Sequence, residues 1–185
     1  MIGGKWFYGA ALLLGGVFFV SGGCGGVQAQ RGTDEAAVVI KGIPFLPQEE
    51  DTCGPSSLAM ILRFLGNYAP TAELVRETRT AGLKGTLITD LAAAARRRGF
   101  TAEVADLDLR RLRERISAGV PVILLVDLGT WVYSRPHYLV AYGWMGEGVL
   151  AHSGREEGKV IPFSALDAQW ATMGRLALIV RREVR

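Results

Sequence analysis

The stretch PQEEDTCGPSSLAMILRFLG (Pro47 to Gly66) predicts the first helix of the chain and places a cysteine at its start. Apolar side chains after the cysteine fall at positions i, i+3, i+4 and i+7, which predicts one buried helix face made of Leu58, Ile61, Leu62 and Leu65. Pro55 is tolerated in a first helical turn, and Gly66 can end the helix. Cys53 is therefore expected at a helix N-terminus.

The remaining pattern predicts helices first and strands second. An entry strand is expected at 38–40, and further helices at 71–80, 87–98 with Thr86 as cap, and 108–118, with one strand at 102–105. Apolar and β-branched runs predict strands at 122–128, 137–144, 149–152, 159–163 and 176–180, with a short helix at 164–170. This order predicts an α+β fold with an antiparallel sheet.

The composition and the first residues predict one folded domain behind an export segment. A chain of 185 residues, 49% apolar and 21% charged, fits a single domain with a real core. Trp6 to Val20 is an apolar run of signal-peptide length, shorter than a membrane span of about 20 residues. We expect a signal peptide or lipoprotein signal at 1–30, a linker at 31–37 and the folded domain at 38–185.

Two processing sites compete at the end of the export segment. Ser21-Gly22-Gly23-Cys24 resembles a bacterial lipobox, in which Cys24 would carry the lipid. Val27-Gln28-Ala29 also fits ordinary signal peptidase cleavage after Ala29, and an uncleaved anchor is a third alternative. The expectation is an exported protein of the bacterial cell envelope, a lipid-anchored membrane protein that faces the periplasm or the exterior.

Charge and cysteine usage exclude several classes of function. The net charge of +3 comes from arginines scattered through helical segments, which argues against nucleic acid as a partner. Once Cys24 is removed or lipidated, Cys53 is the only thiol, so no disulfide is expected within one chain. The two histidines and the thiol have no short metal-ligand spacing, so neither a metal nor another cofactor is expected.

A cysteine at a helix N-terminus is a candidate nucleophile. The helix dipole and the unpaired N–H groups are expected to lower the thiol pKa from about 8.5. His137 follows Arg135-Pro136 at the start of a strand and can project toward the helix terminus as a base, whereas His152 is interpreted as structural. The backbone N–H of Cys53 and the side-chain amide of Gln48 can hold an oxyanion.

These residues carry a family resemblance. Gln48, the segment Asp51 to Pro55, and the segment Pro136 to Val140 followed by a glycine turn resemble the peptidase C39 family, whose papain-like cysteine peptidases are related to double-glycine bacteriocin-processing enzymes. The resemblance covers residues 41–180 and implies a papain-like fold, with an N-terminal helical lobe packed on an antiparallel sheet. It also implies that Cys53 is the nucleophile, His137 the base and Gln48 the oxyanion donor.

The sequence departs from the family pattern after the histidine. The family usually has an aspartate where Ser153 stands here, so Ser153 is the first candidate to orient the imidazole and Asp127 the second. We expect an exported cysteine peptidase, a hydrolase that cuts a peptide or protein substrate. The alternatives are a non-catalytic peptide-binding lipoprotein, and an acyl transferase or amidase that uses the same Cys-His pair.

Overall fold

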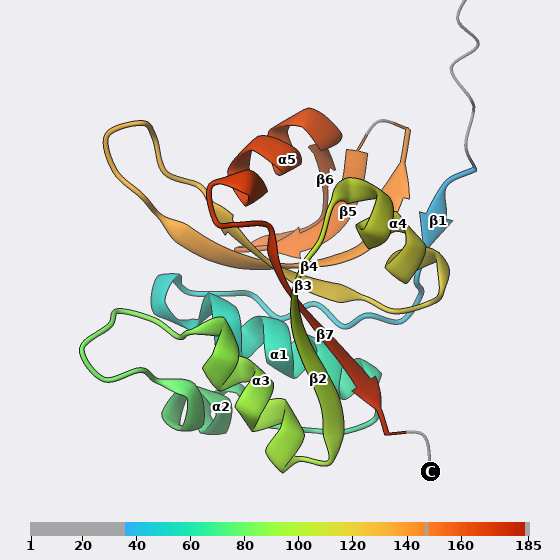
Figure 1. The fold of residues 1–185 in the computed structure, drawn as a ribbon. Coiled ribbons are helices and arrows are strands. Elements are labelled where there is room, and N and C mark those ends of the chain that lie inside the picture. The colour runs from blue at the N-terminus through green and yellow to red at the C-terminus, as the bar shows by residue number, and fades with distance from the viewer. Residues whose placement is uncertain (1–35, 147, 184–185) are drawn as a thin grey trace, which may run out of the picture. The chain divides into compact units, whose positions relative to one another are not determined.

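The structure, a computed structural model, describes residues 36–146 and 148–183 (Figure 1), so the expected signal segment, Cys24 and Ala29 lie outside the described residues. The helices are η1 (Glu50–Thr52), α1 (Cys53–Phe64), α2 (Thr71–Thr78), α3 (Ile88–Arg97), α4 (Leu109–Ser117) and α5 (Phe163–Ala171). The strands are β1 (Val38–Val39), β2 (Phe100–Asp106), β3 (Val122–Asp127), β4 (Pro136–Met145), β5 (Gly148–Ser153), β6 (Glu156–Pro162) and β7 (Leu176–Arg182). Over 36–146 and 148–183, every helix is too short or too polar to cross a bilayer.

All described strands join one antiparallel sheet in the order β2-β7-β3-β4-β5-β6, and β1 pairs with β4. The last strand, β7, lies between β2 and β3. In the middle of the sheet, Val126 of β3 is opposite His137 of β4, and Leu139 of β4 is opposite Ser153 of β5. This register places the candidate base and its candidate partner on neighbouring strands.

Helices cover both faces of the sheet: α1, α2 and α3 lie on one side, and α4 and α5 on the other (Figure 1). Strand β3 is buried on both faces, because Ile123 and Leu125 join the core under α1 and α3, while the alternate residues Val122, Leu124 and Val126 join the core under α4 and α5. Two buried faces explain why β3 is a continuous apolar run in an antiparallel sheet.

The mixed helix and antiparallel-sheet fold confirms the predicted α+β class, and every predicted element is present within a few residues of its expected bounds. One capping prediction is wrong. Helix α3 has Leu87 as its N-cap and no side-chain capping bond. The Thr86 hydroxyl lies 3.4 Å from the Thr78 hydroxyl instead, and the Thr86 carbonyl accepts a 3.0 Å hydrogen bond from the Tyr138 hydroxyl on β4.

Candidate functional site

Cys53 is the first residue of α1, where the helix meets strand β4. Its side chain is buried at 9% exposure, and the backbone N–H of Tyr138 hydrogen-bonds to the thiol. Gly54 permits this close approach, because a Cβ atom there would lie 3.1 Å from Cδ2 of the Tyr138 ring. The thiol therefore contacts the backbone of the residue that follows His137.

His137 is the second residue of β4, and its ring reaches across to β5. The Nε2 atom lies 3.1 Å from the Oγ atom of Ser153, the last residue of β5. Among the described residues, Nδ1 of His137 makes no hydrogen bond. When Nε2 carries the proton and donates it to Ser153, Nδ1 is left with a lone pair that can accept a proton.

Gln48 is buried and makes four hydrogen bonds that join α1 to the β5–β6 turn. Its Nε2 atom donates to Ser57 Oγ at 2.8 Å and to the Cys53 carbonyl at 3.3 Å. Its Oε1 accepts from the Gly154 N–H at 2.7 Å, and its own backbone N–H donates to the Gly154 carbonyl at 2.9 Å. The side-chain amide therefore lies against the start of α1, with both of its N–H hydrogens engaged.

Ser57 and Gly154 are site residues that the sequence reasoning missed. Ser57 is fully buried one helical turn after Cys53, so its i+4 spacing was the available signal. Gly154 has a positive φ of 62°, which lets the chain turn directly after Ser153. Ser153 thus hydrogen-bonds to His137, and the next residue, Gly154, hydrogen-bonds to Gln48.

Asp127, the second candidate to orient the imidazole, has its carboxylate turned into the loop between β3 and β4. Its Oδ1 accepts from the N–H groups of Gly129 and Arg135 at 2.7 Å each, and its Oδ2 accepts from the Ser134 hydroxyl at 2.6 Å. These bonds lower the pKa of the Asp127 carboxyl. The structure brings Ser153, and not Asp127, to the His137 ring.

His152 is a core residue at 2% exposure. Its Nδ1 accepts from the Gly158 N–H at 3.2 Å, so Nε2 carries the proton and donates to the Ile43 carbonyl at 3.3 Å. The ring centroid lies 4.5 Å from that of Tyr142 and 5.2 Å from that of Phe45. Both ring nitrogens are therefore occupied by structural bonds.

Burial controls the protonation of the Cys-His pair. It raises the pKa of the Cys53 thiol, aided by the Asp51 carboxylate, and outweighs the opposing effect of the backbone amides of Tyr138, Gly54 and Cys53. Burial, with the positive charges of Arg135 and Lys159, lowers the pKa of His137 to about 4. The expected fall in the thiol pKa is therefore wrong, because the helix N-terminus is enclosed by β4.

A cleft of about 900 Å³ opens beside these residues, and its lining includes Gln48, His137 and Ser153. Cys53 is not among the lining residues, in keeping with its low exposure. Within the described segments, no group of three or more His, Cys, Asp or Glu side chains is arranged to hold a metal ion. The site combines a cleft lined by Gln48 and His137 with a buried thiol that contacts the β4 backbone at the residue after His137, and these are the residue types that acyl transfer requires.

Several solved structures share this fold. A C39-like peptidase from Bacillus anthracis is 17% identical with a TM-score of 0.66, over 82% of this chain and 100% of that chain. The peptidase domain of Streptococcus ComA, a bifunctional ABC transporter of quorum sensing, is 21% identical with a TM-score of 0.65, over 77% and 100% of the two chains.

A third structure is a double-glycine-motif protease from an AMS/PCAT transporter in complex with its leader peptide, 20% identical with a TM-score of 0.63 over 80% of this chain and 100% of that chain. No curated protein matches this chain. The sequence model of the peptidase C39 family, in contrast, matches residues 44–183, which contain all of the candidate site. The chain belongs to the peptidase C39 family.

Proposed function

We propose that this chain is an exported cysteine peptidase that hydrolyses peptide bonds through Cys53 and His137. One observation carries the proposal: the thiol at the start of α1 meets the β4 backbone at Tyr138, next to an imidazole whose Nε2 is already held by Ser153. Membership of the C39 family and the peptidase domains that share the fold support the same chemistry.

The proposed reaction starts from a neutral pair, since burial favours the thiol over the thiolate and the imidazole over the imidazolium. Nδ1 of His137 takes the thiol proton as sulfur attacks the peptide carbonyl carbon, and the imidazolium then gives that proton to the leaving amine as the C–N bond breaks. Water, deprotonated by His137, attacks the thioester, releases the acid and returns the thiol.

The oxyanion would be held by the Cys53 backbone N–H and by Nε2 of Gln48. Of the two bonds that Nε2 makes, the one to the Cys53 carbonyl is the longer, at 3.3 Å against 2.8 Å for the bond to Ser57. Substrate would replace this longer bond, while the Ser57 and Gly154 bonds keep the amide in place. Ser153 is the residue proposed to orient the imidazole.

The substrate is proposed to be a peptide or protein, because the transporter protease that shares the fold is seen with a leader peptide. Export and a lipid anchor at Cys24 are proposed from the sequence of residues 6–24, with cleavage after Ala29 as the alternative. Incorporation of a labelled fatty acid into the wild type but not into Cys24→Ala would separate these two routes.

The test of the catalytic proposal is a cleavage experiment on a peptide library prepared from a digested bacterial proteome. New termini should appear with the full chain and with Cys24→Ala, the matched control that removes the other cysteine, and should be lost with Cys53→Ala. Equal cleavage by Cys53→Ala would falsify the proposal. Mass analysis of the products separates hydrolysis from transfer of the acyl group to an amine.

A non-catalytic peptide-binding role is the second candidate. It is favoured by the burial that keeps both Cys53 and His137 neutral, and by a serine where the family usually has an aspartate. Under this reading, no library peptide is cut by the wild type, while peptides are retained equally by the wild type and by Cys53→Ala.

A further inference from the structure

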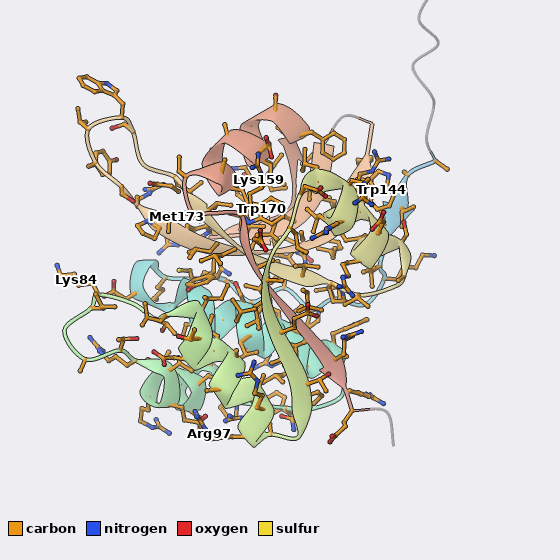
Figure 2. The ribbon with its side chains drawn as sticks, viewed as in Figure 1. Lys84, Arg97, Trp144, Lys159, Trp170 and Met173 are labelled. Atoms are coloured by element: carbon orange, nitrogen blue, oxygen red, sulfur yellow. The ribbon has the colours of Figure 1, made fainter. Side chains whose placement is uncertain are left out.

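Charged side chains of both signs line the cleft. Asp51 lies on the segment that precedes Cys53, and its negative charge acts on the thiol. Cations reach the cleft from several other segments: Figure 2 shows Lys84 on the outer edge of the loop between α2 and α3, and the others are Arg135, Arg155 and Lys159. Glu49 and Glu156 line the cleft as well, so its lining holds four cations and three carboxylates.

Two of these cations face the imidazole. Arg135 lies at the base of the β3–β4 loop, two residues before His137, and Lys159 lies on β6; the positive charge of each acts on His137. Within the described residues the Arg135 guanidinium makes no ion pair, and Lys159 bonds only to Glu156, at 2.7 Å. That pair is exposed, at 41% for Lys159 and 61% for Glu156, so it holds Lys159 weakly.

Cations beside a catalytic base oppose its function, because His137 must become positive during the reaction. A bound anion would neutralise them and remove this opposition. Under the proposed function, on which this inference rests for its orientation, His137 gives its proton to the leaving amine. The half of the substrate that leaves therefore lies beside His137, within reach of the charges of Arg135 and Lys159.

We propose that the cleft selects peptides that carry a carboxylate in the leaving half, bound by Arg135 and Lys159. A guanidinium forms paired hydrogen bonds with a carboxylate, which gives direction as well as charge. The carboxylate belongs either to an acidic side chain just after the scissile bond or to the C-terminus of a short peptide. Both sources present the same chemistry to Arg135.

The test compares two alkylating reagents on the full chain: iodoacetate, which is an anion, and iodoacetamide, its neutral counterpart. Both need the same thiolate, so the ratio of their rate constants at Cys53 cancels changes in the thiol pKa and reports local charge. Mass analysis of the peptide that carries Cys53 excludes the contribution of Cys24. The rate constant for iodoacetate divided by that for iodoacetamide should fall about twofold to fivefold in Arg135→Gln and in Lys159→Gln. The difference between each variant and the wild type should shrink in high salt.

The matched control is Arg97→Gln, because it removes the same charge from α3 at the other end of the described domain (Figure 2). Its ratio should equal that of the wild type. Equal ratios in the wild type, Arg97→Gln, Arg135→Gln and Lys159→Gln would overturn the proposal. Alkylation needs no hydrolysis, so a chain that cuts no peptide can still pass this test, and failure here leaves the Cys53→Ala experiment unaffected.

The source of the carboxylate is assigned by protection of Cys53 from iodoacetamide. Three peptides of one sequence are compared: glutamate in the leaving half with an amidated end, glutamine with an amidated end, and glutamine with a free C-terminus. Stronger protection by the first identifies an acidic side chain, and stronger protection by the third identifies a terminal carboxylate. Equal protection by all three would contradict a carboxylate preference.

Discussion

The two histidines of the chain, His137 and His152, lie on neighbouring strands in regions that differ in one respect. Within the part of the chain that the structure describes, the second ring nitrogen is hydrogen-bonded in His152 and free in His137. His152 is enclosed by Tyr142 and Phe45, with backbone groups bonded to both nitrogens. His137 has one nitrogen bonded to Ser153 and its ring beside the cleft. An imidazole with both nitrogens hydrogen-bonded to the protein serves the core, whereas one with a free nitrogen can transfer a proton.

The largest expected effect separates these two regions directly. His137→Ala should reduce the rate of peptide hydrolysis by about 10²–10⁴-fold, because the proposed general base is lost, and should change the free energy of unfolding little. His152→Ala should lower the free energy of unfolding by about 2–4 kcal/mol, since it leaves a cavity and unpaired backbone groups. Urea denaturation and a hydrolysis assay on both variants test this contrast.

Similar losses of hydrolysis in the two variants, at a temperature where both are folded, would contradict the assignment of proton transfer to His137 and of a core role to His152. His152→Gln is the control for the core site. It keeps one donor and one acceptor and should recover part of the stability that alanine removes.

The second effect concerns the Gln48 side-chain amide and the hydrogen bond from it to Ser57 that positions it. Gln48→Ala should reduce the hydrolysis rate by about 10²-fold, because it removes an oxyanion donor. Ser57→Ala removes only the 2.8 Å bond that holds the Gln48 amide, so its loss should be smaller and should fall on kcat rather than KM. Ser57→Thr, which retains the hydroxyl, is the control. A larger defect in Ser57→Ala than in Gln48→Ala would contradict the proposed role of Gln48.

The smallest expected effect tests whether the side chain at position 153 influences the pKa of His137. His137 must be neutral to accept the thiol proton, so hydrolysis should fall as the pH drops through its pKa of about 4. Ser153→Asp places a carboxylate beside the ring, stabilises the imidazolium and should move this acidic limb upward by about one pH unit. Ser153→Asn, which hydrogen-bonds without charge, should leave the limb in place. Profiles of kcat/KM against pH measure the shift, and a limb that stays in place in Ser153→Asp would exclude contact with His137.

Local patterns in the sequence predicted the elements well because their signals are short-range. The i, i+3, i+4 spacing of the apolar residues defines α1, and the β-branched run at 122–126 defines β3. Pro136 before His137 likewise indicated a strand start close to the observed one. The position of β7 between β2 and β3 had no such signal, because strand pairing between distant segments depends on the whole sheet.

The electrostatics of the site escaped prediction for the same reason. A helix N-terminus lowers a thiol pKa, but burial raises it. Here the burial comes in part from packing against Tyr138, 85 residues after Cys53 (138 − 53), and its effect is the larger. The hydroxyl of Ser57 and the turn at Gly154 likewise engage Gln48 only in the folded chain. Residue types identified the candidate set, and long-range packing decided its protonation and its bonds.

Strand β7 comes after the other described strands along the chain, yet it lies between β2 and β3 in the sheet. Until residues 176–182 emerge, β3 lacks one of its two neighbours, and the sheet that presents His137 to α1 is incomplete. The site around Cys53 and His137 is therefore complete only after nearly all of the described domain has been synthesised. A nascent chain that still lacks β7 is thus expected to be inert toward peptides, its own included.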